Sequence, residues 1–94
     1  MIYYLLTADE WQRVRDDTVV ATPGPEGFVH CCDESQLAGV RAAFFPQDAD
    51  LVTLRLDPTR LEAETRYEPG SRGEPERFPH VHGPIRRIDV EPVV

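Results

Sequence analysis

Three histidines, confined to two short segments, are the side chains of this sequence best suited to chemistry. His30 lies in Gly-Phe-Val-His-Cys-Cys, and His80 and His82 lie in Phe-Pro-His-Val-His-Gly. In an extended segment, His80 and His82 project from one face with their α-carbons about 6–7 Å apart, so both imidazoles could share one ligand. Glu68 precedes a segment rich in Pro and Gly, and its carboxylate could bind a sugar hydroxyl or stabilise a cationic transition state. These four residues are the catalytic candidates.

A zinc site is one alternative for the same side chains. Zinc takes three or four His and Cys ligands, and His30 and Cys32 could complete a set with His80 and His82 because they also lie two apart on one strand face. However, the spacing matches no zinc signature, and a hydrogen-bonded structural pair explains His-x-His equally well. We assign no metal ligand and keep metal binding as an open hypothesis.

A nucleophilic thiol is the other alternative. Cys31 or Cys32 beside His30 could attack a substrate, because the thiolate is the reactive form and an imidazolium favours it. Free cysteines are among the most buried residues, and neighbours on a strand face opposite sides. At least one of the two thiols is therefore expected to pack in the core.

The elements that position these residues are short. Ile2–Leu6 predicts a strand that leads into a helix over Ala8–Asp16, because Thr7 and Glu10 have the spacing of a capping box. A second helix is predicted from Asp33, with Gln36 in the reciprocal capping position, to the Phe-Phe-Pro segment. The remaining predicted strands are Thr18–Thr22, Gly27–Cys32, Leu51–Leu56, Thr65–Glu68 and Arg86–Val90, and Pro69–Arg77 is predicted to be a loop. The pattern predicts one small α+β domain over residues 1–94, with a mainly antiparallel sheet and two helices.

Composition and charge exclude several classes of function. The formal net charge of −7 repels phosphate backbones, so nucleic-acid binding is not expected. No apolar run approaches the roughly 18–20 residues that cross a bilayer, and no basic and then apolar leader opens the sequence. We expect a cytoplasmic protein without a membrane partner, present as a monomer or a weak homodimer.

Several motifs, in order, resemble the domain of unknown function 952 family. They are the opening Ile-Tyr-Tyr, the Gly-Phe-Val-His-Cys-Cys segment with Gln36 after it, the strand Leu51–Leu56 with its Asp, Glu68, and Phe-Pro-His-Val-His-Gly-Pro. The resemblance implies membership of the ADP-ribosyltransferase-like fold group, with a split antiparallel β architecture and a cleft for a nicotinamide dinucleotide. It places His30, Glu68 and His80 on the family's polar positions.

The same resemblance implies a set of substrate-binding residues around these three side chains. Gly27, Phe28 and Gly83 match the family pattern. Tyr4 stands where the family has His, and Cys32 stands where it has Ser. His82 stands where the family has Tyr, so we predict that the rings of Tyr4 and His82 have exchanged places within one pocket and are in contact.

The function that the resemblance implies is binding of, or action on, a nucleotide sugar such as NAD or ADP-ribose. NAD would then be a substrate, and no bound cofactor is expected. His30 or His82 would orient the ribose, and Glu68 would stabilise an oxocarbenium-like transition state as nicotinamide leaves. Four arginines could hold the pyrophosphate of this anionic metabolite: Arg60, Arg66, Arg72 and Arg77. The alternative is that these arginines only keep the surface soluble. The alternative from another class is a non-catalytic binding or regulatory module whose histidines are structural.

Overall fold

The alternating apolar residues of one strand build the centre of the fold. β4 (Leu51–Leu56) completely buries Leu54 and Leu56, as its period-two pattern predicts. β1 (Ile2–Thr7) pairs with one edge of β4 and β8 (Val90–Val93) with the other, and both pairings are antiparallel. This three-stranded sheet therefore contributes one side of the hydrophobic core.

A second three-stranded sheet carries the predicted site. β6 (Arg77–Val81) is its central strand and pairs antiparallel with β3 (Val29–His30) and with β5 (Thr65–Pro69). β2 (Val19–Ala21) and β7 (Ile85–Arg86) form a separate antiparallel pair. The computed structural model describes residues 1–14, 18–70 and 75–93, and every strand pairing within them is antiparallel.

One backbone bridge joins the two larger sheets. Tyr3 N–H donates to the Cys32 carbonyl at 2.8 Å, and Cys32 N–H donates to the Tyr3 carbonyl at 2.9 Å. The bridge ties β1 to the chain that follows β3. Side chains of both sheets contribute to one hydrophobic cluster: Ile2, Leu6, Val29, Cys31, Leu54, Leu56, Val81, Ile85 and Val90.

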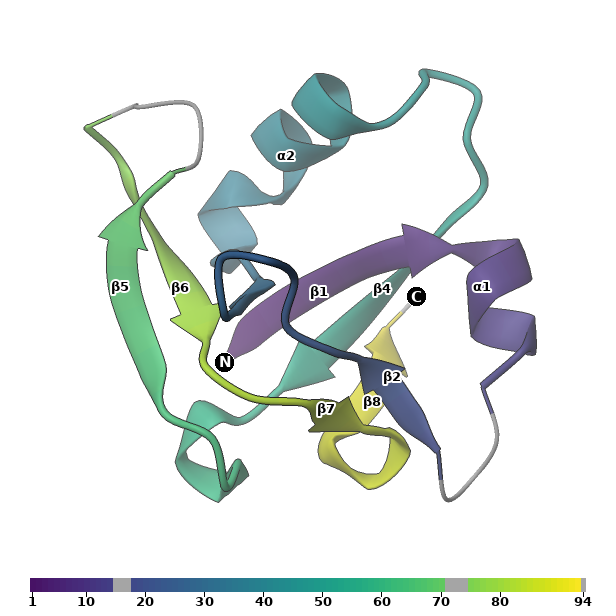
Figure 1. Ribbon diagram of the computed structural model, residues 1–94. Coiled ribbons are helices and arrows are strands. Elements are labelled where there is room, and N and C mark those ends of the chain that lie inside the picture. The colour runs from purple at the N-terminus through teal and green to yellow at the C-terminus, as the bar shows by residue number, and fades with distance from the viewer. Residues whose placement is uncertain (15–17, 71–74, 94) are drawn as a thin grey trace.

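Two α-helices lie outside the sheets. α1 (Ala8–Gln12) follows β1 directly, and α2 (Leu37–Phe44) follows the 3-10 turn η1 (Glu34–Gln36). Two more 3-10 turns are η2 (Pro58–Arg60) and η3 (Arg87–Asp89). In Figure 1, β5 and β6 lie at the left, β1 and β4 cross the centre, and α2 lies above both groups of strands. None of the described helices has the length and apolar character needed to cross a membrane.

Both helices are shorter than the sequence predicts. The capping box of Thr7 and Glu10 forms as expected, but α1 ends at Gln12 and not at Asp16. The N–H groups of Arg13 and Val14 donate to carbonyls three residues back, which tightens the last turn and ends the α-helix. The predicted residues 15–17 lie outside the described part of the chain.

The second predicted helix begins with a different turn. The side-chain oxygen of Gln36 accepts from the N–H of Asp33 at 2.8 Å, as the capping prediction requires. The N–H of Gln36 bonds to the Asp33 carbonyl three residues back, so the first turn is the 3-10 turn η1 and the α-helix begins only at Leu37.

The last predicted strand, Arg86–Val90, is wrong. The carboxylate of Asp89 accepts from the Arg86 N–H at 2.9 Å, so this local capping interaction turns the chain into η3 between β7 and β8.

The predicted strand Gly27–Cys32 is paired as a strand only at Val29–His30, and Thr18–Thr22 only at Val19–Ala21. The predicted loop over Pro69–Arg77 lies between β5 and β6. The sequence analysis did not predict β6 as a strand. The coarser prediction is confirmed, because the structure is a small α+β fold with antiparallel sheets and two α-helices.

Removing the side chain at the centre of β4 should be costly. Leu54→Ala is expected to lower the free energy of unfolding by about 2–5 kcal/mol, because it leaves a cavity in a fully buried position. Chemical denaturation measures this value. Ile88→Ala is the control, since Ile88 is 73% exposed, and it should change stability by less than about 0.5 kcal/mol. Equal effects of the two variants would contradict the placement of the core.

Candidate functional site

The sheet of β3, β6 and β5 places the predicted polar residues on one face. His30 is directly opposite His80, and Glu68 is opposite Phe78. Directly paired residues share a face, and side chains alternate along each strand. His30, His80 and Glu68 therefore converge on the same side of the sheet, as the sequence analysis expected.

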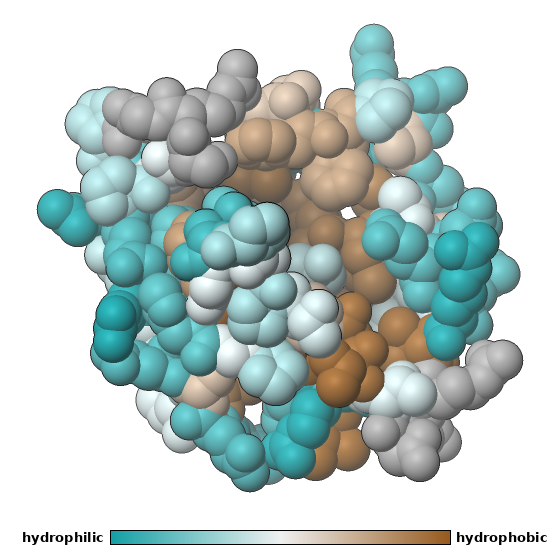
Figure 2. All heavy atoms as spheres, viewed as in Figure 1, coloured by the Kyte–Doolittle hydropathy of each residue, from teal (hydrophilic) through white to brown (hydrophobic). Residues whose placement is uncertain are grey.

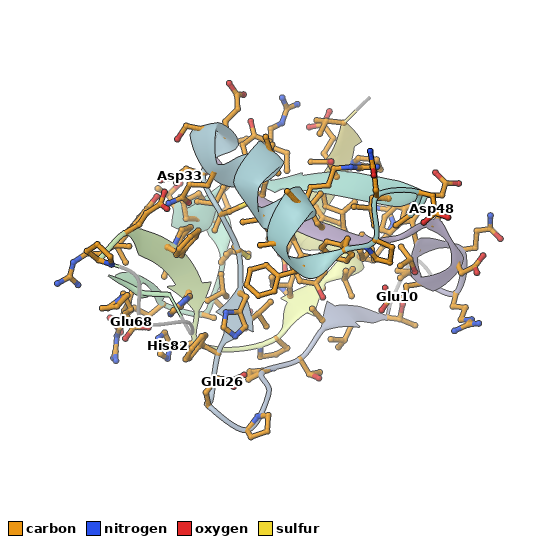
Figure 3. All side chains as sticks on the ribbon, turned by 90° about the horizontal axis from the view of Figure 1, so that it is seen from above. Glu10, Glu26, Asp33, Asp48, Glu68 and His82 are labelled. Carbon is orange, nitrogen blue, oxygen red and sulfur yellow. The ribbon has the colours of Figure 1, made fainter. Side chains whose placement is uncertain are left out.

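Glu68 binds two imidazoles with one carboxylate oxygen. Its Oε1 lies 2.9 Å from Nδ1 of His80 and 2.9 Å from Nε2 of His82. Figure 3 shows Glu68 and His82 beside each other at one end of the molecule. Hydrogen bonds from His82 and then His80 lower the pKa of Glu68, against a smaller opposing effect of burial. The carboxylate is ionised at neutral pH, so both ring nitrogens act as donors to it.

His80 is the most deeply buried polar side chain of this group. It is 2% exposed, and the ring of Phe28 stacks on it with centroids 3.9 Å apart and an angle of 12° between the planes. Its second nitrogen, Nε2, is buried and accepts or donates no hydrogen bond within the described part of the protein. Because Nδ1 points at Glu68, Nε2 points away from that carboxylate.

Phe28 holds the three histidines together. Besides the stack on His80, its ring contacts His30 edge-on at 4.8 Å and His82 at 5.4 Å between centroids. The tight turn before it depends on Gly27, which has φ +90° and donates its N–H to Gly24 at 2.9 Å. Gly27, predicted to bind substrate, therefore has a backbone role that presents Phe28 to the site.

A cavity of about 350 Å³ opens beside His30 and His80. Its walls come from β1, the chain after β3, α2 and the start of β6. Figure 2 shows apolar side chains gathered around a hollow in the upper centre of the molecule. The residues that line it are Tyr3, Tyr4, Leu5, His30, Cys31, Cys32, Val40, Phe44, Phe45, Gly70, Phe78 and His80.

The structure divides the predicted site residues into two groups. Tyr4, His30, Cys32 and His80 line the cavity. The other five predicted residues do not line it: Gly27, Phe28, Glu68, His82 and Gly83. Of these, Phe28 stacks on His80, Glu68 is hydrogen-bonded to His80, and His82 is hydrogen-bonded to Glu68.

Gly83 has a packing role at the end of this segment. A β-carbon at Gly83 would lie 2.6 Å from the β-carbon of Ala63, so only glycine allows the two chain segments to approach this closely.

The predicted contact between Tyr4 and His82 is not observed. The ring of His82 lies against Phe28 and bonds to Glu68, whereas Tyr4 packs against the hydrophobic cluster and lines the cavity. Tyr4 is part of the cavity wall and His82 is not, so the structure lends no support to an exchange of the two rings within this cavity.

The thiol alternative is not supported by the environment of the cysteines. Cys31 and Cys32 are both buried, so both pack in the interior and not only one. Burial raises the pKa of Cys32 to about 11 and raises the pKa of Cys31 further still. Both thiols are neutral at physiological pH and are poor nucleophiles.

The metal alternative also lacks a suitable geometry. Within residues 1–14, 18–70 and 75–93, no three His, Cys, Asp or Glu side chains are arranged to hold a metal ion. His80 and His82 direct a nitrogen each to Glu68 and share a carboxylate. The hydrogen-bonded pair that the sequence analysis kept as an alternative is what the structure contains.

The predicted arginines differ in their surroundings. Arg66 is engaged with Glu64, with Nε 2.7 Å from the carboxylate. Arg60 lies at a separate polar depression with Arg55 and Arg86. Arg77 immediately precedes Phe78 of the cavity wall and donates to the carbonyl of Tyr67 at 3.3 Å. Arg72 lies outside the described residues.

Sequence analysis missed most of the apolar cavity wall. Leu37, Val40 and Phe44 have the spacing of an apolar stripe on the predicted second helix, and such a stripe normally packs in the core. In the structure, no residue of α2 is fully buried and the side chains of Val40 and Phe44 face the cavity. The run Phe44-Phe45-Pro46 at the helix end was the available signal, because two adjacent aromatic residues cannot both point to one core face.

Comparison with known proteins agrees with this architecture. A family model described as "Protein of unknown function (DUF952)" matches residues 5–93. The chain belongs to the DUF952 family. No curated protein matches it.

Two solved structures resemble this DUF952 protein over almost its whole length. The crystal structure of protein CC0527 from Caulobacter crescentus has 26% sequence identity and a TM-score of 0.76, and the match covers 95% of this chain and 79% of that one. A double mutant of CC0527 has 22% identity and a TM-score of 0.76, with 99% and 85% of the two chains covered. The second likeness shows the fold alone.

Acid should weaken the interaction of Glu68 with the imidazoles. A carboxyl group whose pKa is lowered by folding stabilises the protein above its unfolded value of about 4.3, and this contribution is lost as pH falls through the folded pKa. We therefore expect the stability advantage of wild type over Glu68→Gln to decrease as pH falls from about 5 to 3. Denaturant unfolding at several pH values measures the difference. Glu62→Gln, at an 87% exposed side chain, should show no such trend, and an equal trend in both would disprove the assignment.

The close approach at Gly83 gives a second prediction for stability. Gly83→Ala should destabilise the fold by about 1–3 kcal/mol, because the new methyl group overlaps Ala63. Gly39→Ala in α2 is the matched control, since nothing lies within 4 Å of its added β-carbon and alanine favours helix by up to about 1 kcal/mol. Thermal unfolding should therefore show opposite signs for the two variants, and the same sign would contradict the packing role of Gly83.

Proposed function

We propose that this chain binds a nucleotide sugar such as NAD or ADP-ribose, with the base in the apolar cavity and the ribose at its histidine edge. The observation that carries the proposal is the joint position of His30 and His80 on the wall of a mainly apolar cavity of about 350 Å³. Apolar pockets with a few convergent polar groups are typical of small-molecule sites. The fold group that the sequence resemblance implies, the ADP-ribosyltransferase-like proteins, would take the same class of ligand.

The size and the walls of the cavity favour one aromatic ring. A volume of about 350 Å³ is at the lower end of the range of roughly 300–1,000 Å³ for ligand pockets, so it suits a base and not a whole dinucleotide. Tyr4, Phe45 and Phe78 supply aromatic surfaces for stacking or edge contacts. The ribose and the phosphates would then lie outside the cavity.

The ribose has one suitable partner at the cavity edge. The side chain of His30 is 48% exposed and lines the cavity, so its ring can reach both the ligand and solvent. Glu68 does not line the cavity and is bonded to two imidazoles. In this proposal Glu68 acts on the ligand through His80, which replaces the direct role at an oxocarbenium ion that the family resemblance implied.

Charge restricts where a pyrophosphate could bind. The net charge of −7 disfavours an anion over most of the surface, so we expect the phosphates to stay in solvent. Arg66 is paired with Glu64, and Arg60 lies at the separate depression. Arg77 precedes Phe78 in β6, and alternation along the strand directs its side chain away from the face of Phe78 and His80. We therefore assign no phosphate contact to these arginines.

Calorimetric titration with NAD and with ADP-ribose tests the proposal. His30→Ala should weaken binding roughly tenfold, because it removes a hydrogen bond to the ligand. Arg60→Ala is the control and should bind as wild type does. Absence of binding to either compound would refute the nucleotide-sugar proposal and favour a non-catalytic interaction module. Equal effects of His30→Ala and Arg60→Ala would refute the assigned ribose contact.

A further inference from the structure

One buried nitrogen in the cavity wall lacks a hydrogen-bond partner. Nε2 of His80 is inaccessible to solvent, and no described protein group bonds to it. Buried polar atoms are nearly always hydrogen-bonded, because an unsatisfied one costs the free energy of desolvation. His80 lines the cavity, so the group that satisfies this nitrogen would have to be a ligand whose entry uncovers it.

The chemistry of Glu68 determines what kind of partner Nε2 needs. The pKa of Glu68 is lowered by its two imidazole partners, so its carboxylate only accepts hydrogen bonds. Nδ1 of His80, 2.9 Å from that carboxylate, must therefore carry the proton. In the neutral ring the other nitrogen is then an acceptor, so Nε2 needs a donor.

None of the donors in the cavity wall, Tyr4 and His30 among them, is hydrogen-bonded to Nε2 of His80. The hydroxyl of Tyr3 already donates to Glu34 at 3.1 Å. The thiols of Cys31 and Cys32 are neutral and only weak donors. The acceptor at His80 is thus set within a largely apolar wall.

We propose that the ligand of this cavity is an aromatic or heteroaromatic ring that donates an N–H or O–H hydrogen bond to Nε2 of His80. Glu68 is the positioning residue that fixes the tautomer, and His82 holds Glu68 in place through the second 2.9 Å contact. The inference rests on the proposed function in placing the base of the ligand in this cavity. For a nucleotide sugar, the donor would be the carboxamide of nicotinamide or the exocyclic amine of adenine.

The tautomer of His80 can be observed without any ligand. Long-range ¹H–¹⁵N correlation NMR of the wild-type protein at neutral pH should show a protonated Nδ1 and an unprotonated Nε2 for His80. Spectra of His30→Ala and His82→Asn identify the other two rings. A protonated Nε2 on a neutral His80 would overturn the proposal.

Phenol and anisole are a matched pair of probes for the donor. Both rings are small enough for the cavity, but only phenol has an O–H group. We expect wild type to bind phenol roughly tenfold more tightly than anisole, although anisole is the more apolar compound, and we expect phenol to shift the Nε2 resonance of His80. NMR titration measures both affinities, and equal affinities would overturn the proposal.

Variants of the neighbouring carboxylates test the role of Glu68. Glu68→Ala frees His80 to take either tautomer, so the preference for phenol should fall toward unity. Glu64→Ala is the control, because Glu64 directly precedes β5 and pairs with Arg66 instead of His80. A preference that survives in Glu68→Ala would overturn the positioning role.

These outcomes separate the inference from the proposed function. If phenol is preferred but NAD and ADP-ribose do not bind, the donor contact is supported and the nucleotide-sugar proposal is wrong. If the dinucleotide binds but phenol and anisole bind equally, the nucleotide-sugar proposal stands and the donor contact is refuted.

Discussion

The reciprocal pair of backbone hydrogen bonds between Tyr3 and Cys32, at 2.8 and 2.9 Å, connects the core sheet to the sheet that carries the histidines. Both residues line the cavity, as do their neighbours Tyr4 and Cys31. The cavity therefore lies at this junction, and side chains from both sheets line it. Because backbone groups buried at such a junction must be paired, the bridge also limits how far the sheets can move apart.

The third wall of the cavity depends on side-chain interactions between distant parts of the chain. α2 follows η1, and η1 is held by the Nε2 of Gln36, which donates to the Arg77 carbonyl at 2.9 Å and to Glu76 at 3.0 Å. The hydroxyl of Tyr67 donates to Asp33 at 2.7 Å from β5. These contacts anchor the beginning of α2 to the hairpin of β5 and β6 and so place Val40 and Phe44 opposite the histidine face. Interactions outside the site thus define its shape.

Within the site, the hydrogen bonds of Glu68 determine the protonation of its neighbour His80. Glu68 is ionised because two imidazoles donate to it, and this ionised carboxylate in turn determines which nitrogen of His80 carries the proton. The ring of Phe28 stacks on His80, whose remaining nitrogen is buried without a hydrogen-bond partner among the described residues. The carboxylate of Glu68 therefore determines that Nδ1 of His80 carries the proton, which leaves the buried Nε2 of the neutral ring as a hydrogen-bond acceptor.

The sequence by itself determined the class of the fold, the strand Leu51–Leu56 and the starts of both helical segments, because these depend on local periodicity and capping. Strand alternation also indicated that His80 and His82 share a face, and the family resemblance placed His30 and Glu68 with His80. Local patterns misled at Arg86–Val90, where the Asp89 cap outweighs strand propensity. Only the tertiary structure decided which polar residues reach the cavity, that Tyr4 lines it while His82 does not, and that α2 forms a wall. Those features depend on the Tyr3–Cys32 bridge and on contacts such as Gln36 with Glu76, whose partners lie far apart in the sequence and leave no periodic signal in it.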